Sequence, residues 1–420
     1  MYCKTLTILS SIVLLHTAAS AADWPQWFGP ERNGISAETD LLKSWPASGP
    51  QTLWRQSLGR GFSGISISQG RAFTMYAADK DEFIVCLDAA TGKELWRFRT
   101  DNYYREGQGG DGPRSTPTVD GDHVYVLSAQ GKLYALQAAD GKKIWSHDLK
   151  EEFGSEVPTW GFCTSPIVEG DLLYVEAGGK RNNFILDFVF DPEAEATVVA
   201  FDKNSGAAQW IALDDKSAYS SPIAITVAGI RQLVFLTAYA AVGLSPQDGQ
   251  VYWRYPWATR YDVNAATPVF IPPDKIFISS GYDKGAALVQ LKTADEGLEA
   301  EEVWMNRVMK NHFSTSVLHQ GYLYGFDNAI LTCIDPQTGT EKWKQRGYGK
   351  GSLIIADGHL IILGDSGNLA LVEATPAGYQ EKATLQILQG TCWTVPTLSD
   401  GRLYLRSENE IVCLDLKDKS

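Results

Sequence analysis

A short phrase, in which a tryptophan follows a glycine by four residues, recurs along the chain and constrains its fold most strongly. The phrase occurs five times, as the pairs Gly92–Trp96, Gly141–Trp145, Gly206–Trp210, Gly249–Trp253 and Gly339–Trp343. Trp304 ends a sixth unit with a different turn, and Trp54 stands near the N-terminus without a unit before it. A period of roughly 40–50 residues is typical of stacked supersecondary units, and of β-propellers when each unit holds four short strands.

The second unit shows the four strands most clearly. Its predicted strands cover residues 115–119, 123–128, 132–136 and 142–147, and glycine-containing turns separate them. Strands of this length joined by Asp-Gly and similar turns form consecutive β-hairpins. No stretch after residue 22 carries a helical period, so the sequence predicts an all-β fold.

Eight units can be counted, and they begin near Phe62, Ser115, Thr164, Ser220, Ala266, Ser314, Gly351 and Thr394. The seventh has no tryptophan, and the eighth ends after its third strand at residues 412–416. We interpret residues 53–55 as the missing fourth strand, because pairing the two chain ends leaves no open sheet edge. An incidental Leu-Trp pair would leave the last blade incomplete. We therefore predict an eight-bladed β-propeller over residues 53–417, preceded by an extension at residues 23–52.

The first 22 residues have the features of a signal peptide. Lys4 supplies a positive charge, residues 6–15 are apolar, and residues 20–22 are small. No cysteine for a lipid anchor follows, and the apolar stretch is too short for a membrane span. We expect a periplasmic or secreted protein without a transmembrane segment.

Charge and cysteine usage narrow the possible partners. A net charge of −13 argues against nucleic acid, since phosphates require clustered Lys and Arg. Cys86, Cys333 and Cys413 occupy one repeat position, where we favour packed free thiols over a disulfide framework. The reactivity of Cys163 and Cys392 is left open.

The repeated phrase resembles the tryptophan-docking repeat of eight-bladed PQQ-type (quinoprotein) propellers. Residues 23–34 and 311–358 are also similar to uncharacterised exported PQQ-like repeat proteins. In the family the tryptophan packs between neighbouring blades and the glycine makes the turn before the outermost strand. The resemblance therefore implies a structural docking role for Trp54, Trp96, Trp145, Trp210, Trp253, Trp304 and Trp343.

The resemblance implies two kinds of function on one fold. Quinoprotein dehydrogenases carry pyrroloquinoline quinone (PQQ) with calcium, whereas the propeller lipoprotein of the outer-membrane β-barrel assembly machinery is a non-catalytic binding surface. The dehydrogenases hold the quinone beside adjacent cysteines and use acidic calcium ligands. This chain has no Cys-Cys pair, no Asp-x-Asp-x-Asp cluster and no Cys-x-x-Cys-His haem motif. We predict no catalytic residue, cofactor or metal ligand, and keep PQQ with calcium as the alternative.

The loops that lead into the innermost strands should build one face of the ring. The residues expected to crowd its mouth include Phe162, Cys163, Tyr219, Phe313 and Cys392. From this region we predict a ligand-binding set of Asp111, Arg114, Trp160, Asn264, His312, Lys350 and Trp393. The glycine-rich loop at residues 101–113 and the long insertion at residues 177–196 should rise on the same face.

These side chains could hold a flat anion. Arg114 and Lys350 would meet carboxylates, Trp160 or Trp393 would stack, and His312 could act as a general base. That set is consistent with a quinone cofactor or a sugar acid. In the structural alternative the tryptophans plug the channel, Arg114 pairs with Asp111 or a carbonyl, and His312 belongs to a buried network.

Three further tryptophans, Trp24, Trp27 and Trp45, lie in the extension. They could form a partner-binding arm, but we favour packing across the bottom or side of the ring.

The sequence thus predicts a monomeric, exported, non-catalytic binding or scaffold module. Its top face would hold a protein, a glycan or a small anionic ligand. The alternative is a PQQ-dependent oxidoreductase acting on an alcohol or sugar. A polysaccharide-active enzyme would need paired carboxylates, and the mouth has too few acids.

Overall fold

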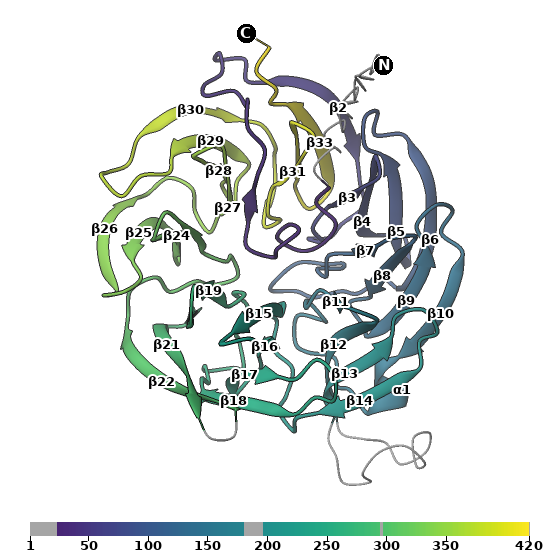
Figure 1. The fold of residues 1–420 in the computed structure, drawn as a ribbon. Coiled ribbons are helices and arrows are strands. Elements are labelled where there is room, and N and C mark those ends of the chain that lie inside the picture. The colour runs from purple at the N-terminus through teal and green to yellow at the C-terminus, as the bar shows by residue number, and fades with distance from the viewer. Residues whose placement is uncertain (1–22, 180–195, 295–296, 420) are drawn as a thin grey trace, which may run out of the picture.

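Eight antiparallel sheets surround a central axis in the computed structural model, which describes residues 23–179, 196–294 and 297–419 (Figure 1). Seven sheets have four strands and one has five. The predicted eight-bladed propeller is therefore confirmed. The predicted signal peptide at residues 1–22 lies outside the described residues, as does most of the insertion at residues 177–196.

The first four blades follow one another along the chain, each with its first strand nearest the axis. Blade 1 contains β3 (Ser66–Ser68), β4 (Arg71–Ala78), β5 (Asp81–Asp88) and β6 (Glu94–Asn102). Blade 2 contains β7 (Thr118–Asp120), β8 (His123–Leu127), β9 (Lys132–Gln137) and β10 (Lys143–Asp148). Blade 3 contains β11 (Ile167–Glu169), β12 (Leu172–Gly179), β13 (Ala196–Asp202) and β14 (Ala208–Ala212). Blade 4 contains β15 (Ile223–Val227), β16 (Ile230–Leu236), β17 (Ala240–Leu244) and β18 (Val251–Pro256).

The last four blades complete the ring in the same manner. Blade 5 contains β19 (Val269–Ile271), β20 (Lys275–Ser280), β21 (Gly285–Ala294) and β22 (Gly297–Asn306). Blade 6 contains β23 (Val317–His319), β24 (Tyr322–Asp327), β25 (Ile330–Asp335) and β26 (Thr340–Gln345). Blade 7 contains β27 (Ser352–Ala356), β28 (His359–Leu363), β29 (Asn368–Glu373) and β30 (Glu381–Gln386). Blade 8 contains β31 (Thr397–Ser399), β32 (Arg402–Arg406), β33 (Glu410–Asp415) and β2 (Gln51–Ser57).

The N-terminal strand β2 closes the ring, as the sequence predicted. It pairs with β33 in an antiparallel ladder that places Trp54 opposite Cys413. In Figure 1 the purple β2 lies beside the yellow β33. The edge that β33 would otherwise leave open is thereby paired, which removes an aggregation-prone edge.

A single short helix departs from the all-β expectation in the described part of the chain. Helix α1 (Leu149–Phe153) follows β10; the Asp148 carboxylate caps its N-terminus and Gly154 ends it with φ of 67°. Five residues are too few to produce a helical period, so the sequence pattern could not show it. No helix among the described residues has the length and apolar character needed to cross a membrane.

Most docking tryptophans join one blade to the next. Their indole Nε1 atoms donate hydrogen bonds of 2.8–3.2 Å to a turn carbonyl of the following blade, in the pairs Trp54–Ala89, Trp96–Ala138, Trp145–Lys203, Trp210–Pro246, Trp304–Pro336 and Trp343–Thr375. Trp253 instead donates to the Gln232 side chain of its own blade, and the following blade carries the long β21–β22 hairpin in place of the glycine turn.

The repeated glycines lie directly beneath these indoles. A Cβ atom on Gly92 would approach Trp54 to 2.6 Å, and one on Gly141 would approach Trp96 to 2.5 Å. Both glycines also have positive φ, which side chains rarely tolerate. The glycine and the tryptophan of one phrase therefore serve two different blade interfaces, which explains why both recur.

Small side chains face the docking tryptophans across the outermost strand pair. Cys86 lies opposite Trp96, and Cys333 lies opposite Trp343. The corresponding thiols are buried and free, as the sequence favoured. Cysteine here fills the space of a small apolar residue.

A belt of hydroxyl groups links the blades around the axis. The Thr116 hydroxyl accepts from Gly64 N (3.1 Å), and the Ser165 hydroxyl accepts from Thr116 N (3.0 Å). Between blades 8 and 1, Thr394 Oγ1 donates to the carbonyl of Phe62 (3.2 Å). These side chains satisfy backbone groups of inner segments that no neighbouring strand pairs.

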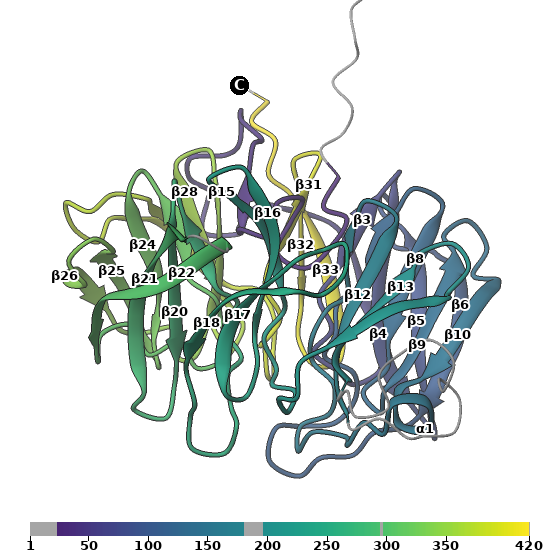
Figure 2. The ribbon, with the colours of Figure 1, turned by 60° about the horizontal axis from the view of Figure 1, so that its bottom comes forward.

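The N-terminal extension crosses one end of the channel. Trp24 forms a bridge with Ile67, and the Arg32 guanidinium donates to the carbonyls of Ser165 and Pro166, both at 2.9 Å. The extension then adds β1 (Ile35–Ser36) parallel to β27. Figure 1 shows this purple segment over the centre of the ring, and Figure 2 shows it on the side opposite α1 and the long loops.

A glycine pair tests the docking geometry. In Gly141→Ala the new methyl group collides with Trp96 and also occupies a backbone with φ of 73°. In the control Gly121→Ala, φ is 56° but no atom lies within 4 Å. We expect a loss of about 3 kcal/mol in unfolding free energy for Gly141→Ala and about 1 kcal/mol for Gly121→Ala, by urea denaturation. Equal losses would contradict the interblade contact.

Candidate functional site

A cavity of about 510 Å³ opens at the end of the channel opposite the extension, among the loops that lead into the innermost strands. Five residues of the predicted ligand-binding set line it, namely Arg114, Trp160, His312, Lys350 and Trp393. These residues come from five different blade connections. Arg114, His312, Lys350 and Trp393 lie just before an innermost segment, and Trp160 lies a few residues further upstream in its loop. The ring geometry therefore gathers side chains that are far apart in the sequence.

Trp27 of the extension closes the inner end of this cavity. Its indole Nε1 donates to Thr267 Oγ1 at 3.0 Å, and its ring stacks on Phe28 with centroids 5.8 Å apart. Trp27 also lines the cavity itself. The extension tryptophans thus pack across the ring rather than project from it, and the cavity has one open end.

An aromatic wall runs around the cavity. The ring of Trp393 lies 5.1 Å from that of Phe62 and 5.2 Å from that of Phe313. The wall continues through His312 to Tyr282, whose rings are 5.0 Å apart. Aromatic faces of this kind bind flat or apolar ligand surfaces.

Arg114 holds the glycine-rich loop and also brings a positive charge to the cavity. Its guanidinium donates to the carbonyls of Gly109 (2.9 Å), Gly110 (2.5 Å) and Gly112 (2.8 Å). It forms no ion pair with a described residue. Arg114 therefore pairs with backbone carbonyls, which is one of the two structural alternatives that the sequence left open. It does so without an acidic partner for its charge.

The ammonium group of Lys350 forms no hydrogen bond or ion pair with any residue in the described ranges. Its backbone N–H donates to Asp365 Oδ2 at 2.8 Å, which fixes the loop. No carboxylate of the described residues lines the cavity. A protein with a net charge of −13 therefore holds a positively charged pocket at this position.

His312 is neutral at physiological pH. Burial, and then the nearby charge of Lys350, lower the pKa of its imidazole to about 4. Its Nδ1 atom is buried and has no hydrogen-bond partner among the described residues. A buried polar atom without a partner is costly, so packing holds this ring in place at some cost in stability.

Two residues of the predicted set do not reach the cavity. The Asn264 side chain is fully buried and donates to the carbonyls of Thr237 (2.8 Å) and Trp257 (3.1 Å). Asp111 accepts hydrogen bonds from the Tyr103 hydroxyl (3.2 Å) and from the backbone of the same loop. Both side chains position loops at the mouth.

Three cavity residues, Phe62, Tyr282 and Trp27, are absent from the predicted ligand-binding set. Phe62 begins the first repeat unit, and this position could have indicated that it lies at the mouth. Tyr282 comes from the turn between β20 and β21, and Trp27 comes from the extension. Neither of these two precedes an innermost strand, so the repeat register could not find them.

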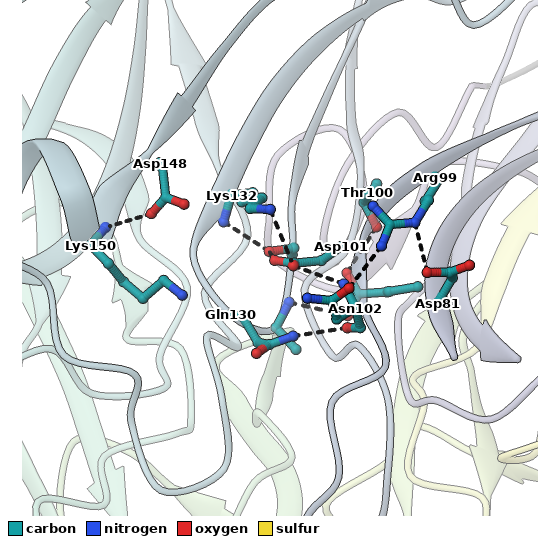
Figure 3. A network of polar contacts seen from close by, with 12 residues as sticks. Asp81, Arg99, Thr100, Asp101, Asn102, Gln130, Lys132, Asp148 and Lys150 are labelled. Atoms are coloured by element: carbon teal, nitrogen blue, oxygen red, sulfur yellow. Dashed lines mark hydrogen bonds and ion pairs between the residues drawn. The ribbon is translucent and has the colours of Figure 1, made fainter. Parts of the chain in front are cut away.

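A polar network anchors the base of the glycine-rich loop to blade 2 (Figure 3). Asp101 accepts from the Ser128 hydroxyl at 2.8 Å and lies 3.5 Å from Lys132 Nζ. The Gln130 amide donates to the carbonyl of Asn102 at 2.8 Å. Beside this network Glu82 is fully buried, and burial raises the pKa of its carboxyl to about 8. These contacts hold the first residues of the glycine-rich loop in place against blade 2.

The two cysteines at the mouth are protonated at neutral pH. Burial raises the pKa of the Cys163 thiol to about 11 and that of Cys392 to about 12. Cys163 lines the cavity and its Sγ lies 3.4 Å from the carbonyl of Gly161. Because the thiolate is the nucleophile, neither residue is an activated one.

The cavity fits the anionic part of PQQ but not the catalytic set that accompanies it. Arg114 and Lys350 could meet its carboxylates, and Trp393 could stack on its rings. Calcium requires six to eight oxygen ligands, whereas no group of three or more His, Cys, Asp and Glu side chains gathers within the described ranges. In the part of the chain that the structure describes, no carboxylate lines the cavity to serve as a base.

The eight blades and their docking tryptophans define a β-propeller with tryptophan-docking repeats. The profile of the PQQ_2 family, described as outer membrane protein assembly factor BamB, matches residues 45–106 and 80–345. The chain belongs to this family. Comparison with curated proteins gave no match.

Several solved structures share the fold at low sequence identity. BamB from Moraxella catarrhalis has a TM-score of 0.59 at 14% identity, with 89% of this chain and 99% of that chain covered. A quinohemoprotein alcohol dehydrogenase from Pseudomonas putida HK5 has a TM-score of 0.63 at 11% identity, with 95% and 81% covered. The computationally designed Ika8 protein has a TM-score of 0.56 at 12% identity, with 87% and 99% covered. These likenesses establish the fold alone.

The depressed pKa of His312 predicts a pH-dependent stability. Between pH 6.5 and 4 the unfolded chain binds more protons than the folded chain, so stability falls as the pH falls through this window. His312→Gln should reduce the loss in unfolding free energy between pH 7 and pH 4.5 by about 1 kcal/mol, a discounted value because the ring is partly exposed. Denaturant unfolding at both pH values measures it. An unchanged pH dependence would show that the imidazole is not desolvated.

The raised pKa of Glu82 predicts the opposite trend at higher pH. Between pH 4.5 and 8 the folded chain binds more protons than the unfolded chain, so stability falls as the pH rises. Glu82→Gln should lose less stability between pH 6 and pH 9 than the natural protein, by at least 1 kcal/mol. The exposed Glu94→Gln is the control and should keep the natural pH dependence. A Glu82→Gln protein that behaves like the control would contradict the buried protonated carboxyl.

Proposed function

We propose that the protein is an exported, monomeric and non-catalytic binding module whose cavity holds a small planar anion. One observation carries this proposal: Arg114 and Lys350 bring positive charge to an aromatic cavity that no carboxylate of residues 23–179, 196–294 and 297–419 lines. An anion there would gain two favourable charge interactions in a partly desolvated site.

The cavity's chemistry favours binding over catalysis. The lowered pKa makes His312 a weak base at neutral pH, and the thiol of Cys163 is protonated. A PQQ-dependent oxidoreductase is the second candidate, because the same cations suit the quinone's carboxylates. It lacks support from a calcium ligand set in the described part of the chain.

Calorimetric titration with galacturonate and with PQQ, with and without calcium, tests the proposal. We expect saturable binding of at least one of these anions that weakens at least tenfold in Lys350→Ala, because the ammonium group has no other partner. Lys350 is a better target than Arg114, whose loss would also release the glycine-rich loop.

The control variant is Lys93→Ala, which removes an equal charge from an exposed turn far from the cavity. It should bind both anions like the natural protein. Absence of heat at high ligand concentration, or equal binding by both lysine variants, would overturn the proposal. Tight PQQ binding that requires calcium would favour the oxidoreductase.

A further inference from the structure

We propose that the anion in the cavity is the acidic end of a longer glycan, whose next sugar units lie on exposed tyrosines at the rim. This inference rests on the proposed function and extends its site outward. Two pairs of an arginine and a tyrosine flank the mouth, one on the loop between blades 4 and 5 and one on the glycine-rich loop. Each pair combines an exposed charge with an aromatic face.

The first pair continues the aromatic wall of the cavity. Tyr282 lines the cavity, and its ring lies 6.0 Å from that of Tyr261. The Tyr261 side chain is 61% exposed, and the Arg260 guanidinium lies over its ring at 4.9 Å. An aromatic path therefore leads from His312, inside the cavity, to solvent.

The backbone under these tyrosines is sterically disfavoured. Tyr261 and Asp262 have φ of 79° and 60°, and Tyr282 and Asp283 have φ of 53° and 60°. Bulky residues rarely adopt such values, and strained residues of this kind cluster at functional sites. Packing does not account for Tyr261, since most of its side chain contacts solvent. A ligand that binds to the exposed ring of Tyr261 explains both its disfavoured backbone conformation and its exposure.

The second pair lies on the glycine-rich loop. The Arg105 guanidinium lies over the Tyr103 ring at 4.5 Å, and the Tyr103 hydroxyl is fixed by Asp111. Gln108 and Gly109 of the same loop line the cavity. Neither Arg105 nor Arg260 forms an ion pair with a residue in the described ranges. Both guanidinium groups are therefore available to an anionic chain that leaves the cavity.

An acidic glycan matches this alternation of rings and charges. Pyranose rings present flat faces of C–H groups that stack on aromatic side chains, and each uronate adds a carboxylate for a guanidinium. Each tyrosine is followed by an acid. Asp262 beside Tyr261 lies 3.7 Å from Lys216 Nζ, whereas Asp283 beside Tyr282 is exposed and forms no ion pair with a described residue, so the anionic chain should pass on the Tyr261 side. Nucleic acid is disfavoured by the net charge of −13. A glycan is therefore a better match than a polyphosphate.

Calorimetric titration of the full-length mature protein with galacturonate and with tetragalacturonate tests the inference. We expect the tetramer to bind at least tenfold more tightly than the monomer. Tyr261→Ala should abolish that gain and leave monomer binding unchanged, whereas Tyr261→Phe should retain it. Maltotetraose, a neutral tetramer, should bind at least tenfold more weakly than tetragalacturonate, because it lacks the carboxylates.

The outcomes separate this inference from the proposed function. Monomer binding without a gain for the tetramer, or a gain that survives Tyr261→Ala, overturns the glycan site and leaves the anion cavity in place. Equal binding of maltotetraose also overturns it. A hexaglutamate peptide that shows the same dependence on Tyr261 would replace the glycan with an acidic peptide. Absence of binding by either galacturonate, with PQQ also unbound, removes the proposed function itself.

Discussion

The contact between a tryptophan of one blade and a glycine of the next sets the rest of this structure. Trp96 packs on Gly141 and donates to the carbonyl of Ala138, so one side chain supplies apolar contact and a hydrogen bond. Repetition of this contact fixes the spacing between blades, and β2 extends it across the junction of the chain ends through Trp54. Most blades are thereby held on both sides, although the junctions of blade 4 with blade 5 and of blade 7 with blade 8 lack this contact.

Because the ring is closed, loops that are far apart in the sequence meet at one end of the channel. Arg114 and Lys350 are separated by much of the chain, yet both precede an innermost strand and line one cavity. The hydroxyl belt satisfies the backbone of these inner segments, and Trp27 closes the far end. The blades thus fix the position of the cavity walls, and loops such as residues 101–113 supply the side chains that determine what the cavity can bind.

The sequence predicted the parts of the structure that follow the repeat. Blade number, the closing strand and four cavity residues follow from the position of each residue within the repeat, and the fifth, Trp160, was predicted from a neighbouring loop. Asn264 has such a repeat position too, but its amide turns inward because three backbone carbonyls are within its reach. Trp27 and Thr267 are 240 residues apart in the sequence, so no local pattern could pair them. The lowered pKa of His312 depends on burial and on a lysine from another blade connection.

A crystal structure of the protein grown with saturating galacturonate is the decisive experiment. The account predicts a bound sugar in the cavity, with its carboxylate between the Arg114 guanidinium and the Lys350 ammonium and its ring against Trp393. A sugar bound elsewhere on the ring, or a cavity filled by rearranged aromatic side chains, would contradict the account.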